Sequence, residues 1–121
     1  VALFKANASI TGTYGAATTI YSQMTGDSDE LAATGGYSTG GFALTNVNPT
    51  STSTTAFTDF SANASWSSAT FTTRGCLIYN TSDSNSAVAV IDFGADYSVS
   101  GGTFEIQWPA ADSTNAIIRI A

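Results

Sequence analysis

The fold is decided by two runs, Gly75-Cys-Leu-Ile-Tyr79 and Ala87-Val-Ala-Val-Ile-Asp-Phe93. Apolar, β-branched and aromatic residues dominate both runs, and such residues favour strands. The segment between them, Asn80-Thr-Ser-Asp-Ser-Asn-Ser86, is wholly polar. Two apolar runs around a polar loop predict an antiparallel hairpin. The second run is nearly continuous in apolar residues, so we expect it to be a central strand covered on both faces.

A strict alternation predicts a third strand. In Thr103-Phe-Glu-Ile-Gln-Trp108 every second side chain is apolar, which is typical of a strand with one buried and one wet face. Gly101 and Gly102, directly before it, predict a turn. Pro109 directly follows it and is expected to end the strand, because proline has no N–H group for the sheet ladder.

Other patterns predict further elements. Strands are expected over residues 41–47, 69–73 and 115–120. Residues 16–24 contain three consecutive β-branched side chains, which favour a strand over a short helix. Residues 50–55 are all serine or threonine and are expected to form an exposed loop.

These elements predict an all-β fold class. Several short strands, with turn signals at intervals near ten residues, are typical of an antiparallel β-sandwich or a jelly roll. No linker or internal repeat divides the sequence, so we expect residues 1–121 to form a single β-sandwich domain. Residues 1–8 are expected to serve as an N-terminal arm or an edge strand.

The charged residues limit the chemistry of the chain. It has no histidine, and its basic residues are Lys5, Arg74 and Arg119, against nine acidic residues, so its net charge is −6 at pH 7. Without histidine, the commonest general base and metal ligand is missing. Three cations cannot neutralise a nucleic-acid backbone, and an acidic chain is repelled by anionic membranes. We therefore expect no nucleic-acid partner and no membrane partner.

The single cysteine, Cys76, excludes an intrachain disulfide. It lies among apolar residues, so we expect a buried, unreactive thiol. The lack of disulfides indicates folding in a reducing cytoplasm. Residues 1–5 lack the pattern of a signal peptide, and no stretch reaches the roughly 20 apolar residues that a membrane helix needs.

Two patterns are candidates for catalysis. Gly36-Tyr-Ser-Thr-Gly40 matches the G-x-S-x-G nucleophile elbow, but that serine needs a base such as histidine, so a turn is the favoured interpretation. Asp92, Asp96 and Glu105 are candidates for the paired carboxylates of a glycosidase, which lie about 5 to 10 Å apart. We favour exposed strand and turn carboxylates instead. We expect no catalytic residues and no enzyme activity.

Asp27, Asp29 and Glu30 are candidate calcium ligands, because carboxylate oxygens suit that ion. The spacing of an EF-hand loop fails, since Ala32 stands where glycine is required and Ser38 where glutamate is required. An irregular calcium site stays an alternative to a solvated acidic loop, which we favour. We expect no bound metal and no cofactor.

Four aromatic residues are candidates for a sugar-binding face. They are Trp66, Phe71, Phe104 and Trp108. Exposed aromatic rings can stack on a sugar, but these residues alternate with polar ones along the chain, as buried strand residues do. We therefore favour a place in the core for them.

Several segments resemble small virion proteins of tailed bacteriophages. They are Arg74-Gly-Cys-Leu-Ile-Tyr79, Ala87-Val-Ala-Val-Ile-Asp-Phe-Gly94, Gly101-Gly-Thr-Phe-Glu-Ile-Gln-Trp-Pro109 and Ala116-Ile-Ile-Arg-Ile-Ala121, together with Gly36-Tyr-Ser-Thr-Gly-Gly-Phe-Ala-Leu44. These segments lie within residues 36–44 and 74–121, which make up a little under half of the chain, and the resemblance leaves out residues 11–30. It implies a β-rich capsid decoration (cement) protein, a type that commonly forms trimers over joints between major capsid subunits.

We therefore expect a structural virion protein that is made in the host cytoplasm and bound to the capsid surface. Its expected partner is the major capsid protein, and its expected assembly is a homo-oligomer, a trimer. Unpaired strand edges are natural docking elements. The apolar start of the chain suits that role, which makes Leu3, Phe4 and Lys5 the candidate interface residues. The alternative is a phage tail, fibre or host-adhesion module that binds surface carbohydrate.

Overall fold

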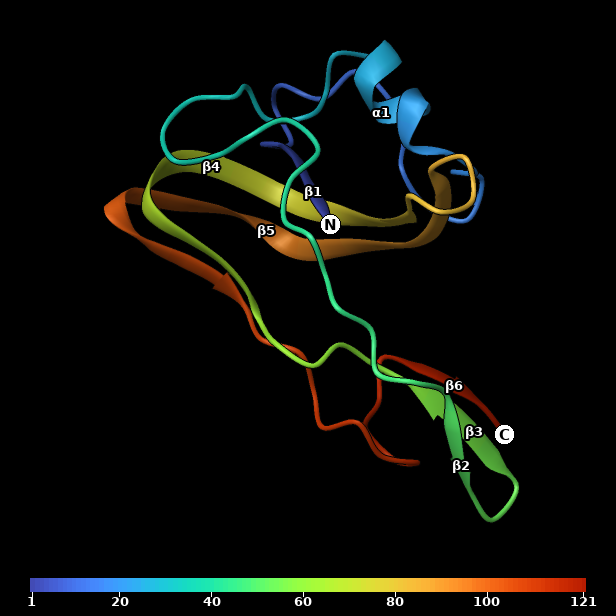
Figure 1. Cartoon of the computed structure of the whole chain (residues 1–121). Helices are drawn as coiled ribbons and strands as arrows, with labels where there is room; N and C mark the ends of the chain where they lie inside the picture. Colours follow the sequence, from blue (N-terminus) through green and yellow to red (C-terminus); the bar gives the residue numbers. More distant parts are fainter. The chain divides into compact units, whose positions relative to one another are not determined.

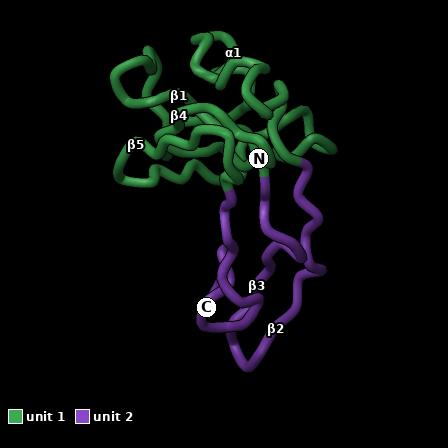
Figure 2. The backbone as a smooth tube through the Cα atoms, turned by 90° about the vertical axis from the view of Figure 1, so that its left-hand side faces the viewer, with its two compact units in different colours: residues 1–42, 66–104 green, residues 43–65, 105–121 purple.

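Six strands and one short helix account for the regular structure of residues 1–121, which a computed structural model describes in full (Figure 1). The chain divides into two compact units (Figure 2). Unit 1 comprises Val1–Phe42 and Trp66–Phe104, and unit 2 comprises Ala43–Ser65 and Glu105–Ala121. Each unit contains one three-stranded antiparallel sheet, so the predicted all-β, sandwich-like fold class is confirmed. The single domain over residues 1–121 stays a prediction.

The sheet of unit 1 has the strand order β1-β4-β5. Its strands are β1 (Ala2–Lys5), β4 (Ala64–Asn80) and β5 (Ser86–Ile106). Residues 81–85 connect β4 to β5, so the predicted hairpin is confirmed. β1 pairs antiparallel with the other side of β4, with Leu3 opposite Cys76. The central strand of this sheet is therefore β4.

The prediction of a central strand over residues 87–93 is wrong, because β5 is an edge strand. Cys76, Leu77 and Ile78 of β4 are buried, whereas Val88 of β5 is 49% exposed. An apolar run shows that side chains avoid water, but it does not show whether a second strand pairs on its far side. At the start of β5, Ala87, Ala89 and Val90 are half-buried, and Val88 is exposed.

The predicted turn at Gly101 and Gly102 is also wrong, since β5 continues through both residues. Gly94 and Gly101 have φ angles of 81° and 66° within the strand, a conformation that marks a bulge or bend. Beyond Gly102 the predicted alternation is confirmed. Phe104 is half-buried, and Glu105 is exposed.

Close packing between β1 and β4 depends on Gly75. A Cβ atom at this position would collide with the Phe4 ring and with the carbonyl oxygen of Ile91. One register shift interrupts the ladder between Phe4 and Lys5. There the buried hydroxyl of Thr73 donates a hydrogen bond of 2.8 Å to the carbonyl oxygen of Phe4. The Thr73 hydroxyl thus gives the Phe4 carbonyl oxygen a hydrogen-bond donor at the point where the regular strand pairing is interrupted.

The prediction of a strand over residues 16–24 is wrong, because α1 (Tyr21–Gly26) begins within it. The Gln23 side-chain oxygen accepts hydrogen bonds from the backbone N–H groups of Thr19 at 2.7 Å and Ile20 at 3.1 Å. These bonds fix the backbone where the helix begins. Within the helix, the Met24 side chain is fully buried. At six residues, α1 is too short to cross a membrane.

The sheet of unit 2 has the strand order β2-β3-β6. Its strands are β2 (Thr50–Thr52), β3 (Thr55–Thr58) and β6 (Ile118–Ile120). The loop predicted over residues 50–55 is instead a hairpin, as the β-branched threonines there allow, and β2 is exposed. The strand predicted over residues 115–120 forms at its end as β6. The strand predicted over residues 41–47 is absent, and only Asn46 makes a bridge, to Phe60.

Candidate interaction surfaces

The start of the chain is packed into unit 1. Leu3 is fully buried and Phe4 is 3% exposed. The outer edge of β1 is covered by its own chain, since Leu31 N–H donates to the Leu3 carbonyl at 3.1 Å and Lys5 N–H donates to the Asp29 carbonyl at 2.9 Å. The Lys5 ammonium donates to the Ser28 carbonyl. Leu3 and Phe4 therefore belong to the core of unit 1. The interface expected from the sequence at Leu3, Phe4 and Lys5 stays a prediction.

The acidic segment that covers β1 is not a solvated loop, and that prediction is wrong for Asp29. Asp29 is 1% exposed, and its carboxylate accepts hydrogen bonds from Thr11 N–H at 2.8 Å, Gly12 N–H at 2.7 Å and the Tyr14 hydroxyl at 2.7 Å. Burial pushes the pKa of Asp29 upward, but these donors outweigh it and hold the pKa below its ordinary value. Asp29 therefore anchors the backbone at residues 11–14.

Glu30 forms a second anchor with tyrosine side chains. Its carboxylate accepts hydrogen bonds from the hydroxyls of Tyr21 and Tyr37, the latter at 2.8 Å, and from Gly40 N–H at 2.6 Å. Burial and these contacts with Glu30 raise the pKa of both tyrosines above the ordinary value. The phenols therefore remain protonated donors. The rings of Tyr21 and Tyr79 stack with their centres 4.4 Å apart.

The two anchors do not converge on an ion. The carboxylates of Asp29 and Glu30 each accept from N–H and O–H donors, whereas a cation needs free oxygen acceptors. No group of three or more candidate ligand side chains is present in residues 1–121. Sequence reasoning missed both anchors. The one local signal was that these acids directly precede the apolar Leu31 with no basic residue beside them.

The G-x-S-x-G segment forms turns, with Ser38 exposed. Gly36 and Gly40 have φ angles of 81° and 89°, which glycine adopts without strain. Tyr37, between them, is 3% exposed, and its hydroxyl also accepts a hydrogen bond from Leu3 N–H at 3.1 Å. The glycines therefore serve to place Tyr37 in the core.

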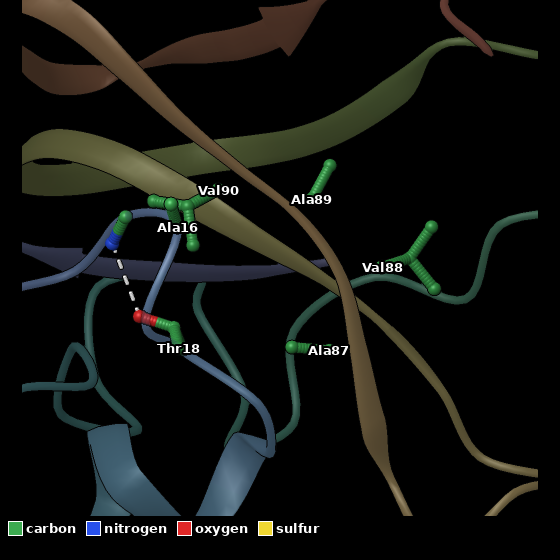
Figure 3. Close-up of a pocket in the computed structure, with 7 residues that line it drawn as sticks. Ala16, Thr18, Ala87, Val88, Ala89 and Val90 are labelled. Atoms are coloured by element: carbon green, nitrogen blue, oxygen red, sulfur yellow. Dashed lines mark hydrogen bonds between the residues drawn. The ribbon is translucent and has the colours of Figure 1, made fainter.

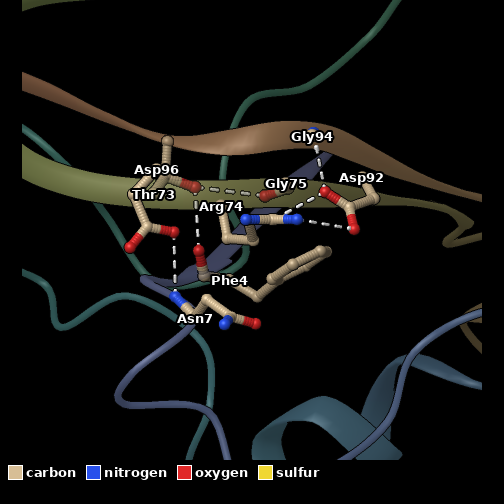
Figure 4. Close-up of polar contacts among 8 residues, drawn as sticks. All are labelled: Phe4, Asn7, Thr73, Arg74, Gly75, Asp92, Gly94 and Asp96. Carbon is tan, nitrogen blue, oxygen red and sulfur yellow. Dashed lines mark hydrogen bonds and ion pairs between the residues drawn. The ribbon is translucent and has the colours of Figure 1, made fainter.

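The three carboxylates proposed for glycoside cleavage have separate partners, and Figure 4 shows those of Asp92 and Asp96. Asp92 pairs with Arg74 across β4 and β5, with 2.7 Å between Oδ1 and Nε. The hydrogen bond from Arg74 holds the pKa of Asp92 below its ordinary value. Asp96 accepts a 2.9 Å hydrogen bond from Asn7 N–H. Glu105 belongs to unit 2 and accepts from the Asn63 side chain at 3.3 Å.

The four aromatic residues proposed for a sugar-binding face are divided between the units. In unit 1, Trp66 is 5% exposed and its ring centre lies 5.9 Å from that of Phe104. Phe71 packs edge-on against Phe104 at 5.4 Å. In unit 2, Trp108 packs against Phe60 at 5.1 Å. The prediction of a place in the core is confirmed for Trp66, and the other three rings are half-buried.

The outer edge of β5 is largely open. The segment Thr19–Tyr21 pairs only with its beginning, through bonds from Ala87 N–H to the Thr19 carbonyl at 2.9 Å and from Tyr21 N–H to the Asn85 carbonyl at 3.0 Å. Beside this point lies a groove of about 280 Å³ (Figure 3). It is lined by small residues, which are Gly15, Ala16, Thr18, Ala87, Val88, Ala89 and Val90.

Unit 2 has a small core and open edges. Its buried apolar side chains are those of Phe57, Ala64 and Ala116. The buried carboxylate of Asp59 accepts hydrogen bonds from the N–H groups of Phe60 and Ile117, and so ties β3 to the segment before β6. At the edge of the sheet, Ile120 of β6 is 73% exposed.

Comparison of the chain with known proteins found no matching family model, no matching curated protein and no matching solved structure.

Proposed function

We propose that this protein is a structural virion protein that decorates a bacteriophage capsid and stabilises it by bridging neighbouring major capsid subunits. One observation carries the proposal: each compact unit ends its sheet in an open edge, β5 in unit 1 and β6 in unit 2. A bridging protein needs two contact surfaces, and an open edge offers backbone N–H and C=O groups for pairing. Segments that resemble phage virion proteins contribute to both strands.

The small core of unit 2 supports the same function. The unit has 40 residues and no cysteine, and only three of its apolar side chains are buried. Folded units of about this size usually depend on disulfides, metals or association. Covering the exposed Ile120 side chain and the edge of β6 with a neighbouring subunit supplies apolar burial that unit 2 lacks.

The test uses shells of the parent phage assembled without this protein. We expect the purified protein to co-sediment with these shells until the sites are saturated, and to raise the temperature at which the shells come apart. Ile120→Asp should weaken this binding at least tenfold. Ala110→Asp is the matched control, because Ala110 is exposed in a loop of unit 2. Absence of wild-type binding to the shells would refute the proposal.

A second candidate function is a tail, fibre or host-adhesion module that binds carbohydrate. The observation that favours it is Tyr97, which is 51% exposed and packs edge-on against Phe93 at 6.0 Å. A supported, exposed aromatic ring can stack on the apolar face of a sugar. Binding to host glycans that Tyr97→Ala abolishes, together with immuno-gold labelling of the tail, would select this function over capsid decoration.

A further inference from the structure

The open part of β5 is long and lacks any backbone partner on its outer side. After Ala87, no backbone hydrogen bond joins that side of the strand to another segment of the chain. The unit 1 part of the strand continues to Phe104. The covering segment Thr19–Tyr21 therefore acts as a short fourth strand that stops where the open edge begins. An added strand would continue the same ladder from Val88 onward.

The groove beside this edge suits apolar side chains. Its volume is about 280 Å³, and most of its lining residues are alanine and valine. Ala16 and Val90 both line the groove, and Val88, which also lines it, is 49% exposed. In strand addition, alternate side chains of the incoming segment enter such depressions. The groove therefore suits one or two apolar side chains of an extended segment.

The charges along the edge select the kind of segment. Residues 81–104 contain Asp83, Asp92 and Asp96 and no lysine or arginine. Arg74 pairs with Asp92, whereas Asp83 and Asp96 are exposed and make no ion pair. A second copy of this chain would bring the same acids to the edge, and like charges across a strand pair are unfavourable. A basic segment is complementary to the edge.

We propose that the edge of β5 after Ala87, together with the groove between residues 15–18 and 87–90, accepts an extended partner segment that carries lysine or arginine, added as a strand to the β1-β4-β5 sheet. The identity of the partner rests on the proposed function, under which the segment belongs to the major capsid protein.

The test titrates the isotope-labelled protein with an octapeptide of alternating lysine and valine. We expect saturable changes in amide chemical shift confined to residues 15–18 and 88–96. The octapeptide of alternating glutamate and valine is the matched probe and should bind at least tenfold more weakly. Absence of shifts at these residues, or equal binding of the two peptides, would overturn the inference.

A pair of variants locates the site. Val88→Lys places a cation at the rim of the groove and should weaken binding of the lysine–valine peptide at least tenfold. Thr39→Lys carries the same added charge in an exposed turn and should bind the peptide as the wild type does. The amide spectra of both variants report whether they are folded. Equal binding by a folded Val88→Lys variant would contradict the proposed site.

The capsid shells separate this inference from the proposed function. Peptide binding at β5 without binding to shells would uphold the surface and refute capsid decoration. Binding to shells without any peptide effect at β5 would refute this surface and leave decoration standing. Binding to shells that Val88→Lys weakens and Thr39→Lys does not would support both.

Discussion

Replacing Asp29 by asparagine removes the charge of the buried anchor and keeps its shape. Oδ2 of the carboxylate accepts three hydrogen bonds, from Thr11 N–H, Gly12 N–H and the Tyr14 hydroxyl, at 2.7 to 2.8 Å. Oδ1 accepts from Thr11 N–H at 3.0 Å. The amide keeps one oxygen acceptor and turns the other into an NH2 group, which is itself a donor. With the amide oxygen in the place of Oδ2, the three hydrogen bonds lose the contribution of the negative charge, and the NH2 group faces the Thr11 N–H group, which is also a donor.

The size of the effect follows from the number of bonds. Hydrogen bonds to a charged group contribute about 1 kcal/mol more than neutral ones. Three such bonds weaken or break, so we expect the free energy of unfolding to fall by about 3 kcal/mol at pH 7. For a chain of this length, this corresponds to a fall in melting temperature of about 10 °C.

The effect depends on pH with a defined sign. The pKa of Asp29 is lower in the folded protein than its ordinary value, which is about 3.9 in an unfolded chain. The stability that the carboxylate contributes is therefore complete above that value, and it is lost as the pH falls through the folded pKa. The difference in unfolding free energy between wild type and Asp29→Asn should be largest at pH 7 and should narrow below about pH 4.

Urea unfolding followed by circular dichroism at pH 7 and at steps down to pH 3 measures these differences. Asp27→Asn is the matched control, because it makes the same change two residues away at an exposed side chain. It should change the free energy of unfolding by less than about 0.5 kcal/mol. Two results would refute the anchor role of Asp29. One is equal unfolding free energies of Asp29→Asn and Asp27→Asn at pH 7. The other is a difference in unfolding free energy between wild type and Asp29→Asn that stays constant down to pH 3.

Three further predictions concern the two cores. Gly75→Ala should lower the free energy of unfolding by about 1 to 3 kcal/mol, because the added methyl group would meet the Phe4 ring. Gly15→Ala is the control, because the space around its Cβ is open, and it should have little effect in the same urea titration. Burial raises the pKa of Cys76 to about 12, so a thiol reagent at pH 8 should label it only after denaturant is added, and rapid labelling of the folded protein would contradict this. Asp59→Ala leaves two backbone N–H groups without their acceptor. The free energy of unfolding of unit 2 should therefore fall by about 1 to 3 kcal/mol per group. Unchanged rates of amide hydrogen exchange in unit 2 would contradict this prediction.

The elements that depend on local pattern were predictable from the sequence. The hairpin of β4 and β5 follows from two apolar runs around residues 81–85, and the alternation near Phe104 reports a half-buried strand. Both signals are local in the sequence, since the first spans residues 75–93 and the second residues 103–108. The position of β5 at the sheet edge was not predictable, because the place of a strand in a sheet is set by which other segments pair with it. α1 was missed because one side chain, Gln23, caps its start against the preference of the β-branched residues before it.

The candidate surfaces were less accessible to sequence analysis. Asp29 binds donors that lie 15 to 18 residues away in the sequence, so no local pattern reveals that its charge is buried. The apolar start of the chain predicts an interface at Leu3 and Phe4, and the structure shows that both side chains are buried within their own chain. The open edge of β5 depends on where the segment Thr19–Tyr21 stops, which is a property of the tertiary structure.

The pairing of Ala2 with Leu77 sets an order of events during synthesis. β1 leaves the ribosome before β4, with which it pairs, so this pairing cannot form until some seventy further residues have been translated. Proteins dominated by such distant pairings fold slowly. Leu3 and Phe4 therefore remain uncovered on the nascent chain for that interval, when chaperones have access to them.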